Sequence, residues 1–466
     1  MISSFYMRFL TVGLFIILLI FTRFFNLEKT ARFIWDESSD LVNIRRIYIQ
    51  KDITLIGPIS EDGNKVFGSL TYYMLIPFAV IGNFDPASTA YGAAFWGVIT
   101  GILFLIISYK LNKKSEVLTL LLIIFWSAIL IPSRWAWNPN FMPFWSALSI
   151  IMLLSKNKFK YILSGLFLGL TIHHHYLGAF TTFGLWLVIL KDSIRSKNYK
   201  DIINFSFGSF FAISPFILFD LTHKPDLFLS RILYFNNLDS NLGILGTFSK
   251  IGNYVISNNY LVLFSIIFIV PLVWIDIKKR SSSLNYLFIF IFSGLLLTLT
   301  KNYYDHYLLA SLPFLFTYLI YKREGIGNLI SKILIFIIII SSLINFPKII
   351  NNVTWETNIP AIRNIAQIMG DEIKLKDLKN VNTVVLQSPD PNTYGRRYRD
   401  LLLIKGINLK NKNEYEISDH LFVITYKPYE EILKDSAYEI KIFKKGKLEN
   451  SWDIPNSSWK VFLLGK

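Results

Sequence analysis

Repeated long apolar stretches are the feature of this sequence that most constrains its fold. A membrane-spanning helix takes ~20 mostly apolar residues, and about eleven stretches approach that length. Charged residues make up only 17% of the chain, against roughly 25% in a soluble globular protein. The pattern predicts an all-α polytopic membrane domain, with the first stretch retained as an anchor. The stretches begin near Leu10, Thr89, Val117, Phe141, Tyr161, Tyr176, Ile203, Tyr254, Leu284, Tyr307 and Leu329.

Basic residues in short loops predict how these spans are oriented, because such loops remain in the cytoplasm. The basic loops are residues 110–114, 156–160, 191–200, 278–280 and 321–323. All five lie on one side only if the apolar stretch 66–82 does not cross the membrane. That stretch is therefore predicted to be a helix in the outer interface, with Tyr72 and Tyr73 at headgroup depth. In a plasma membrane, the N-terminus is then cytoplasmic and the first loop, residues 26–87, is outside.

The composition changes at about residue 347, where charges become frequent and short β-rich runs appear at 383–386 and 421–425. We expect two domains: a membrane domain over 1–346 and a small extracytoplasmic α/β domain over 347–466. The net charge of +16 fits cytoplasmic loops and lipid headgroups better than nucleic acid. The chain has no cysteine, which excludes disulfides and thiolate nucleophiles.

The first loop carries adjacent acids, Asp36 and Glu37, followed by Asp40. Ionisable residues beside a membrane are candidates for function, so this pair is a candidate for acid/base chemistry. Asp is also a good helix N-cap, and Asp36 precedes a predicted helix over 38–48. Position alone leaves both interpretations open.

Three more polar segments fall on the predicted outer side. Arg134, between apolar spans, is suited to a phosphate, while Trp135 and Trp137 can stack on a sugar or anchor at the interface. Residues 173–175 are three histidines, which one helix cannot aim at a single metal because neighbours project ~100° apart. Residues 301–307 combine cations and aromatic rings. This combination fits a binding site for a lipid headgroup, and it fits equally an aromatic girdle at the membrane interface.

A fourth cluster, Tyr394–Arg399 in the C-terminal region, fits either a solvated surface or a contact with a lipid phosphate. No glycine-rich nucleotide loop stands out, which favours a donor substrate carried by a lipid.

Several motifs together resemble the GT-C polyprenyl-phosphate-sugar glycosyltransferases, especially the protein O-mannosyltransferase and aminoarabinose-transferase type. The resemblance covers most of residues 1–346. The motifs are Asp36-Glu37, Gly57-Pro58, Gly68-Ser69-Leu70-Thr71-Tyr72-Tyr73, His175-Tyr176 and the Tyr-Tyr-Asp-His-Tyr run at 303–307.

The resemblance implies an inverting transfer of a hexose-type sugar from a polyprenyl phosphate to a hydroxyl of a lipid, glycan or protein at the outer face. It implies Asp36 as the catalytic base and Glu37 as a residue that orients the site or binds acceptor. It makes no cofactor certain: a divalent cation is possible but is not indicated. Donor-phosphate ligands are then Lys65, Arg134, Lys301 and His306; further substrate-binding candidates are Asp40, Tyr72, Tyr73, His173, His175, Tyr303 and Tyr304.

A transporter or lipid flippase is the main alternative. Transporters place ionisable residues at mid-membrane around broken helices, whereas most acids here lie at predicted span ends, and no internal repeat is apparent. A non-catalytic assembly protein and an oligosaccharide ligase are further alternatives.

Overall fold

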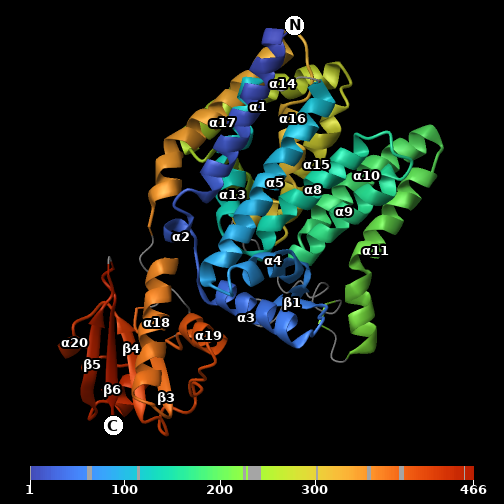
Figure 1. Ribbon diagram of the computed structural model, residues 1–466. Helices are drawn as coiled ribbons and strands as arrows, with labels where there is room; N and C mark the ends of the chain where they lie inside the picture. Colours follow the sequence, from blue (N-terminus) through green and yellow to red (C-terminus); the bar gives the residue numbers. More distant parts are fainter. Residues whose placement is uncertain are drawn as a thin grey trace. The chain divides into compact units, whose positions relative to one another are not determined.

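A computed structural model of the protein describes residues 2–59, 66–112, 116–223, 227–228, 243–300, 303–353, 358–387, 393–455 and 457–466, with side chains from Leu10 onward. The chain divides into two compact units (Figure 1). The membrane unit comprises residues 1–25, 54–74 and 93–350. The α/β unit comprises residues 26–53, 75–92 and 351–466.

Helices account for most of the membrane unit, and each predicted apolar stretch contains helix. Among the residues that the structure describes, four helices are long and apolar enough to span a membrane, and the bent pair α6–α7 makes a fifth. The other apolar stretches form shorter helices. The helices are α1 (Ile2–Phe24), α5 (Pro86–Asn112), α6 (Val117–Phe125), α7 (Ser127–Leu130), α8 (Met142–Leu153), α9 (Lys160–His174), α10 (Gly178–Ser196), α11 (Lys200–Thr222), α13 (Gly243–Ile256), α14 (Asn259–Lys278), α15 (Ser283–Leu297), α16 (Leu312–Leu319) and α17 (Ile326–Asn351).

Helix α13 was not predicted from the sequence, in which the nearest apolar stretch begins near Tyr254. Its buried residues Thr247, Ile251 and Val255 are spaced four apart, which places them on one helical face. That stripe packs against α15 and α7. This spacing of apolar residues is visible in the sequence, but it extends over too few residues to predict a membrane span.

The predicted cytoplasmic loops meet at one end of the membrane unit. Asn112 at the end of α5 donates to the carbonyl of Ile320 at 2.7 Å. Lys191 on α10 donates to Asn285 on α15 at 2.7 Å. These contacts support the grouping of the basic loops on one side.

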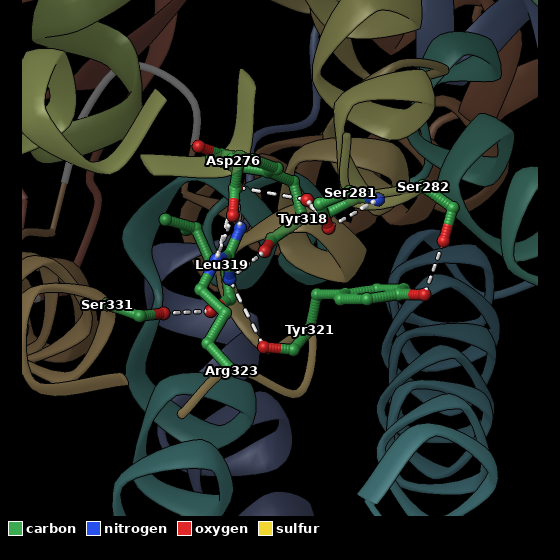
Figure 2. A network of polar contacts seen from close by, with 9 residues as sticks. Asp276, Ser281, Ser282, Tyr318, Leu319, Tyr321, Arg323 and Ser331 are labelled. Carbon is green, nitrogen blue, oxygen red and sulfur yellow. Dashed lines mark hydrogen bonds and ion pairs between the residues drawn. The ribbon is translucent and has the colours of Figure 1, made fainter. Parts of the chain in front are cut away.

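An ion pair at the same end joins α14 to the segment between α16 and α17 (Figure 2). Arg323 donates to both carboxylate oxygens of Asp276, with its shortest distance 2.7 Å, and both side chains are buried. Ser283 adds a hydrogen bond to Asp276 at 2.9 Å, and Arg323 also donates to the carbonyl of Tyr318. Satisfying most of the polar atoms limits the desolvation cost of burying such a pair.

The stretch 66–82 forms a strand and a short helix. Strand β2 (Val66–Gly68) pairs antiparallel with β1 (Ile56–Ile59), so the expected Gly57-Pro58 turn is part of a strand. Gly57 is required there because a Cβ would overlap the carbonyl of Gly68. Helix α4 (Leu70–Ile81) has 12 residues, a length of about 18 Å. It is too short for the ~30 Å hydrocarbon core.

The tyrosines of α4 make contacts within the protein. Tyr72 is only 2% exposed, so its ring packs inside the protein and is not presented to lipid; its depth in the membrane stays a prediction. The Tyr73 hydroxyl donates to the carbonyl of Thr54 at 2.7 Å and accepts from its N–H at 3.0 Å. The Tyr73 hydroxyl therefore holds the chain at Thr54 against α4.

The α/β unit contains a four-stranded sheet of order β3-β4-β6-β5. β3 and β4 are parallel, and the other pairs are antiparallel. β3 and β4 correspond to the β-rich runs seen in the sequence; all their residues are buried except His420 at the start of β4, as expected of strands covered on both faces. The elements are α2 (Leu27–Thr30), α3 (Trp35–Gln50), α18 (Ile359–Leu375), β3 (Val381–Val385), α19 (Arg396–Ile404), β4 (His420–Thr425), α20 (Tyr429–Ile432), α21 (Tyr438–Ile442), β5 (Lys447–Asp453) and β6 (Lys460–Gly465).

Candidate functional site

The acid pair lies in the first turn of α3, which begins at Trp35. Glu37, only 1% exposed, accepts the Ile34 N–H at 2.9 Å and pairs with Arg32 at 3.0 Å. A carboxylate is favourable here because the helix N-terminus carries partial positive charge. The capping hydrogen bond suggested for Asp36 is thus made by Glu37, and Asp36 is half-buried beside it.

Helix α19 packs against α3 within the α/β unit. Ser38 donates to Asp400 at 2.7 Å, and the guanidinium of Arg396 lies 5.6 Å from the centre of the Trp35 ring. Burial raises the pKa of Asp400, although the Ser38 hydrogen bond and the Arg396 charge oppose this. Residues 26–53 of the first loop and residues 351–466 therefore pack in one compact unit, and the turn that carries Asp36 is held within it.

The basic–aromatic run 394–399 supplies α19 and is mostly not a solvated surface. Arg397, Tyr398 and Arg399 are buried. Arg399 donates to Asn382 and to the carbonyls of Thr383 and Tyr394. Its polar contacts fix α19 to the sheet, so the solvated-surface interpretation is wrong for these three residues.

Three connections of the membrane unit, all predicted to lie on the outer side, converge on an aromatic–histidine cluster. Its members are Trp137, His175, Tyr304, His306 and Tyr307. The His306 ring lies 4.4 Å from Trp137, 5.2 Å from His175 and 5.7 Å from Tyr304, between ring centres. His175 also lies 5.0 Å from Tyr307. The segments come from η2 (Asn138–Phe141), the end of α9 and η3 (Asp305–Leu308). Sequence reasoning placed them on one face, and the structure brings them into contact.

The other two histidines are buried in the membrane unit. His173 Nε2 lies 2.7 Å from the carbonyl of Ala212 on α11. Trp145 donates to His174 Nε2 at 2.9 Å, so the ring proton is on Nδ1 and points to Thr71 Oγ1 at 2.8 Å. These bonds orient the end of α9 and present His175 to the cluster. No group of three His, Asp or Glu able to hold a metal occurs among the residues with defined positions.

Arg134 is buried and turned toward a helix end. It donates to the carbonyls of Thr22, Arg23 and Phe25 at 2.7, 3.1 and 2.9 Å. These carbonyls lie at the end of α1, where no intrahelical donor follows. Arg23 in turn donates to Ile123 and Ile124, near the end of α6. The guanidinium groups of Arg134 and Arg23 thus donate hydrogen bonds to the unpaired carbonyls at two helix ends. The sequence alone does not distinguish this role from the binding of a phosphate.

A cavity of about 860 Å³ adjoins the cluster. Its wall includes Tyr303, Tyr304 and Asp305 from the η3 segment and Lys250 and Asn253 from α13. Burial raises the pKa of Asp305, while the Tyr303 hydroxyl and the Lys250 charge lower it. The cavity offers hydroxyl, amide and charged groups, which suit a polyhydroxylated ligand. Lys250 and Asn253 were missed because they belong to the unpredicted helix α13.

Two predicted phosphate ligands, Lys65 and Lys301, lie outside the described residues. Asp40, in contrast, is described: it lies on α3 in the α/β unit and is buried.

Comparisons with known proteins identify the fold. No protein-family model matches the sequence, and no curated protein matches it either. Two crystal structures of ArnT from Cupriavidus metallidurans are similar, each with 8% sequence identity. The apo structure has a TM-score of 0.59 over 99% of this chain and 98% of that chain. The structure bound to undecaprenyl phosphate has a TM-score of 0.60 over 98% and 97%. The predicted resemblance is therefore confirmed at the level of the fold, which this chain shares with ArnT over nearly its whole length.

Proposed function

We propose that this protein is a membrane glycosyltransferase that moves a hexose-type sugar from a polyprenyl-phosphate donor to a hydroxyl acceptor. The observation that supports this most is the whole-chain fold match to ArnT, one structure of which holds undecaprenyl phosphate. The acceptor is a lipid, glycan or protein hydroxyl at the outer face of the plasma membrane. This sidedness follows from the positive-inside rule.

The proposed reaction inverts the anomeric carbon. The acceptor hydroxyl gives its proton to Asp36, and its oxygen forms a bond to the anomeric carbon. The bond from that carbon to the phosphate oxygen breaks, and the polyprenyl phosphate leaves with the electron pair. The N-terminus of α3 favours an ionised Asp36 before the reaction.

The remaining site residues take roles that follow from their contacts. Glu37 is a positioning residue, since its carboxylate is engaged with Arg32 and Ile34. His306, at the centre of the aromatic–histidine cluster, is a proposed donor to the leaving phosphate, as are Lys65 and Lys301. Arg134 is the weakest phosphate candidate because its guanidinium already serves three carbonyls.

The cavity beside the cluster is the proposed place for the sugar. Tyr303 and Tyr304 contribute rings and hydroxyls to its wall. Aromatic rings next to amide and carboxylate groups can match the apolar faces and hydroxyls of a sugar. His175 borders the cluster from the end of α9.

Replacement of Asp36 by Asn tests the function. The substitution keeps the size of the side chain and removes the base, so sugar transfer should fall by about 10²-fold or more. Asp52→Asn is the control, because Asp52 lies on the same loop and contacts only Arg46 in its described ion pairs. Mass spectrometry of lipids, glycans and glycoproteins from a deletion strain complemented with each variant gives the readout. Full product formation with Asp36→Asn, at equal membrane abundance, would rule out the proposed base.

A further inference from the structure

The α/β unit contains a second pocket, of about 570 Å³, that the transfer reaction does not use. It lies where α3, the turn between α4 and α5, α18 and α19 come together. Arg45, Arg363 and Lys405 line it, together with Phe84 and the apolar side chains of Ile49 and Ile404.

The charges of this pocket favour an anion. Arg363 is already compensated, since it pairs with Asp85 at 2.6 Å and Glu28 at 3.1 Å. Burial alone lowers the pKa of Arg363, but the hydrogen bonds and charges of these two carboxylates outweigh burial and raise it. Arg45 and Lys405 therefore supply the positive charge that remains at the pocket.

Among the described residues, the ring that Arg45 contacts and the hydrogen-bond partner of Lys405 are both uncharged. The described contact of the Arg45 guanidinium is with the Phe84 ring, 6.0 Å from its centre. Lys405 donates to the amide oxygen of Gln367 at 2.5 Å. Burial and the nearby charge of Lys374 lower the pKa of Lys405, against the attraction of Asp371 and Asp85. Neither cation has a described ion pair in the pocket, and a bound anion would supply one to both.

The pocket adjoins the start of a helix that is long and apolar enough to span a membrane. Its turn ends at Pro86, the first residue of the 27-residue span α5. Ile81, just before this turn, is 85% exposed, and Ile49 is also exposed. Apolar residues around a basic pocket at the start of a span are suited to a molecule with both a charged and an apolar part.

The turn holds a conformation that its residues rarely adopt. Asn83 and Phe84 have φ values of 49° and 56°, in the left-handed region that a bulky aromatic residue seldom occupies. The Tyr48 ring lies 6.0 Å from the Phe84 ring, and Arg45 contacts its face. Such strain persists where the surroundings hold it in place, commonly at ligand-binding segments.

We propose that this pocket binds the phosphate of an anionic phospholipid headgroup. Arg45 and Lys405 contact the phosphate, and Ile49 and Ile404 contact the glycerol and the first part of the acyl chains. A phospholipid accounts for the apolar rim, which a free phosphate would leave unused. The site does not depend on the transfer reaction or on Asp36.

Titration of the full-length protein in detergent with dioctanoyl-phosphatidylglycerol tests the proposal, with binding followed by the shift in melting temperature. Dioctanoyl-phosphatidylcholine and inorganic phosphate serve as the comparison probes. We expect phosphatidylglycerol to bind at least about tenfold more tightly than either. Equal binding of inorganic phosphate would overturn the lipid assignment in favour of a free-anion site, and equal binding of phosphatidylcholine would overturn the anion preference.

The double variant Arg45→Gln and Lys405→Gln should weaken phosphatidylglycerol binding by about tenfold or more. The matched control is Arg46→Gln with Lys412→Gln, which removes the same charge from exposed positions of the same unit. Lys405→Gln alone is the second variant. The described hydrogen bond of Lys405 is to exposed Gln367, so the loss of this bond should not unfold the unit. Unchanged affinity in both pocket variants, or equal weakening in the control, would overturn the proposal.

Discussion

Several helix ends in this protein are completed by charged side chains. Glu37 closes the N-terminus of α3, where orphan N–H groups and the helix dipole favour a carboxylate. Arg134 closes the C-terminus of α1, where orphan carbonyls need donors. Water does not easily reach the unpaired N–H and C=O groups of a buried helix end, so a charged side chain is a favourable hydrogen-bond partner for them.

Glu37 should be important for stability through both of its contacts. Glu37→Ala removes the Ile34 hydrogen bond and the Arg32 ion pair, and should lower the free energy of unfolding by roughly 1–3 kcal/mol, since Arg32 is partly exposed. Glu37→Gln keeps an acceptor for Ile34 and should cost about half as much. Denaturant unfolding of the purified protein measures both. Equal losses for the two variants would show that the cap contributes nothing.

Asp400 should make the α/β unit pH-dependent. Its pKa is raised by burial in the folded state, so its favourable contribution is complete below the unfolded pKa of about 3.9 and is lost as pH rises through the folded value. Asp400→Asn still accepts from Ser38 and removes the buried charge. The variant should match the wild type in melting temperature near pH 4 and exceed it increasingly toward pH 7.

Exposed Asp377, which pairs with Lys379, provides the control for this titration. Asp377→Asn should leave the pH profile unchanged because an exposed pair contributes little. A wild-type profile for Asp400→Asn would contradict the expected effect of burial.

At the scale of elements, α9 and α11 pack with their backbones in contact (Figure 1). A Cβ on Gly165 would overlap the carbonyl of Phe205, and one on Gly208 would overlap the carbonyl of Ile162. Four residues further along each helix, Gly169 faces Ala212. Small residues four apart on both helices are the usual basis of close packing in membranes, and this pair fixes the end of α9 that carries His175.

Gly165→Val should therefore separate α9 from α11 and lower the melting temperature of the protein by several degrees, consistent with an overpacking cost of about 1–3 kcal/mol. Gly13→Ala, on α1, is a control for adding a side chain to a helical glycine, since no atom lies within 4 Å of its Cβ. Thermal unfolding in detergent compares the two. A melting temperature for Gly165→Val equal to that of Gly13→Ala would mean that the close approach does not stabilise the pair.

At the scale of the whole molecule, the sequence predicts what depends on local pattern. The apolar stretches and the basic loops predicted the helices and their common end, and the β-rich runs predicted β3 and β4. The runs around His175 and His306 predicted that these residues share a face. Local pattern did not predict contacts between distant segments: the Ser38–Asp400 hydrogen bond joins residues 362 positions apart, and nothing near Arg134 indicates that the end of α1 is its partner.

The absence of cysteine from the sequence gives a direct test of the sidedness on which the proposed function depends. Single cysteines at Gln50 and Lys412 lie in the α/β unit, and one at Lys279 lies in a basic loop that is predicted to be cytoplasmic. An impermeant maleimide applied to intact cells should label the first two and should label the third only after permeabilisation, because basic loops are retained in the cytoplasm.

The two α/β positions must behave alike, whichever way the protein is inserted, because residues 26–53 and 351–466 form one compact unit. Different labelling of Gln50→Cys and Lys412→Cys would contradict that unit. Labelling of Lys279→Cys alone in intact cells would leave the unit intact and reverse the orientation, placing Asp36 in the cytoplasm. The unmodified chain has no thiol to react and supplies the background.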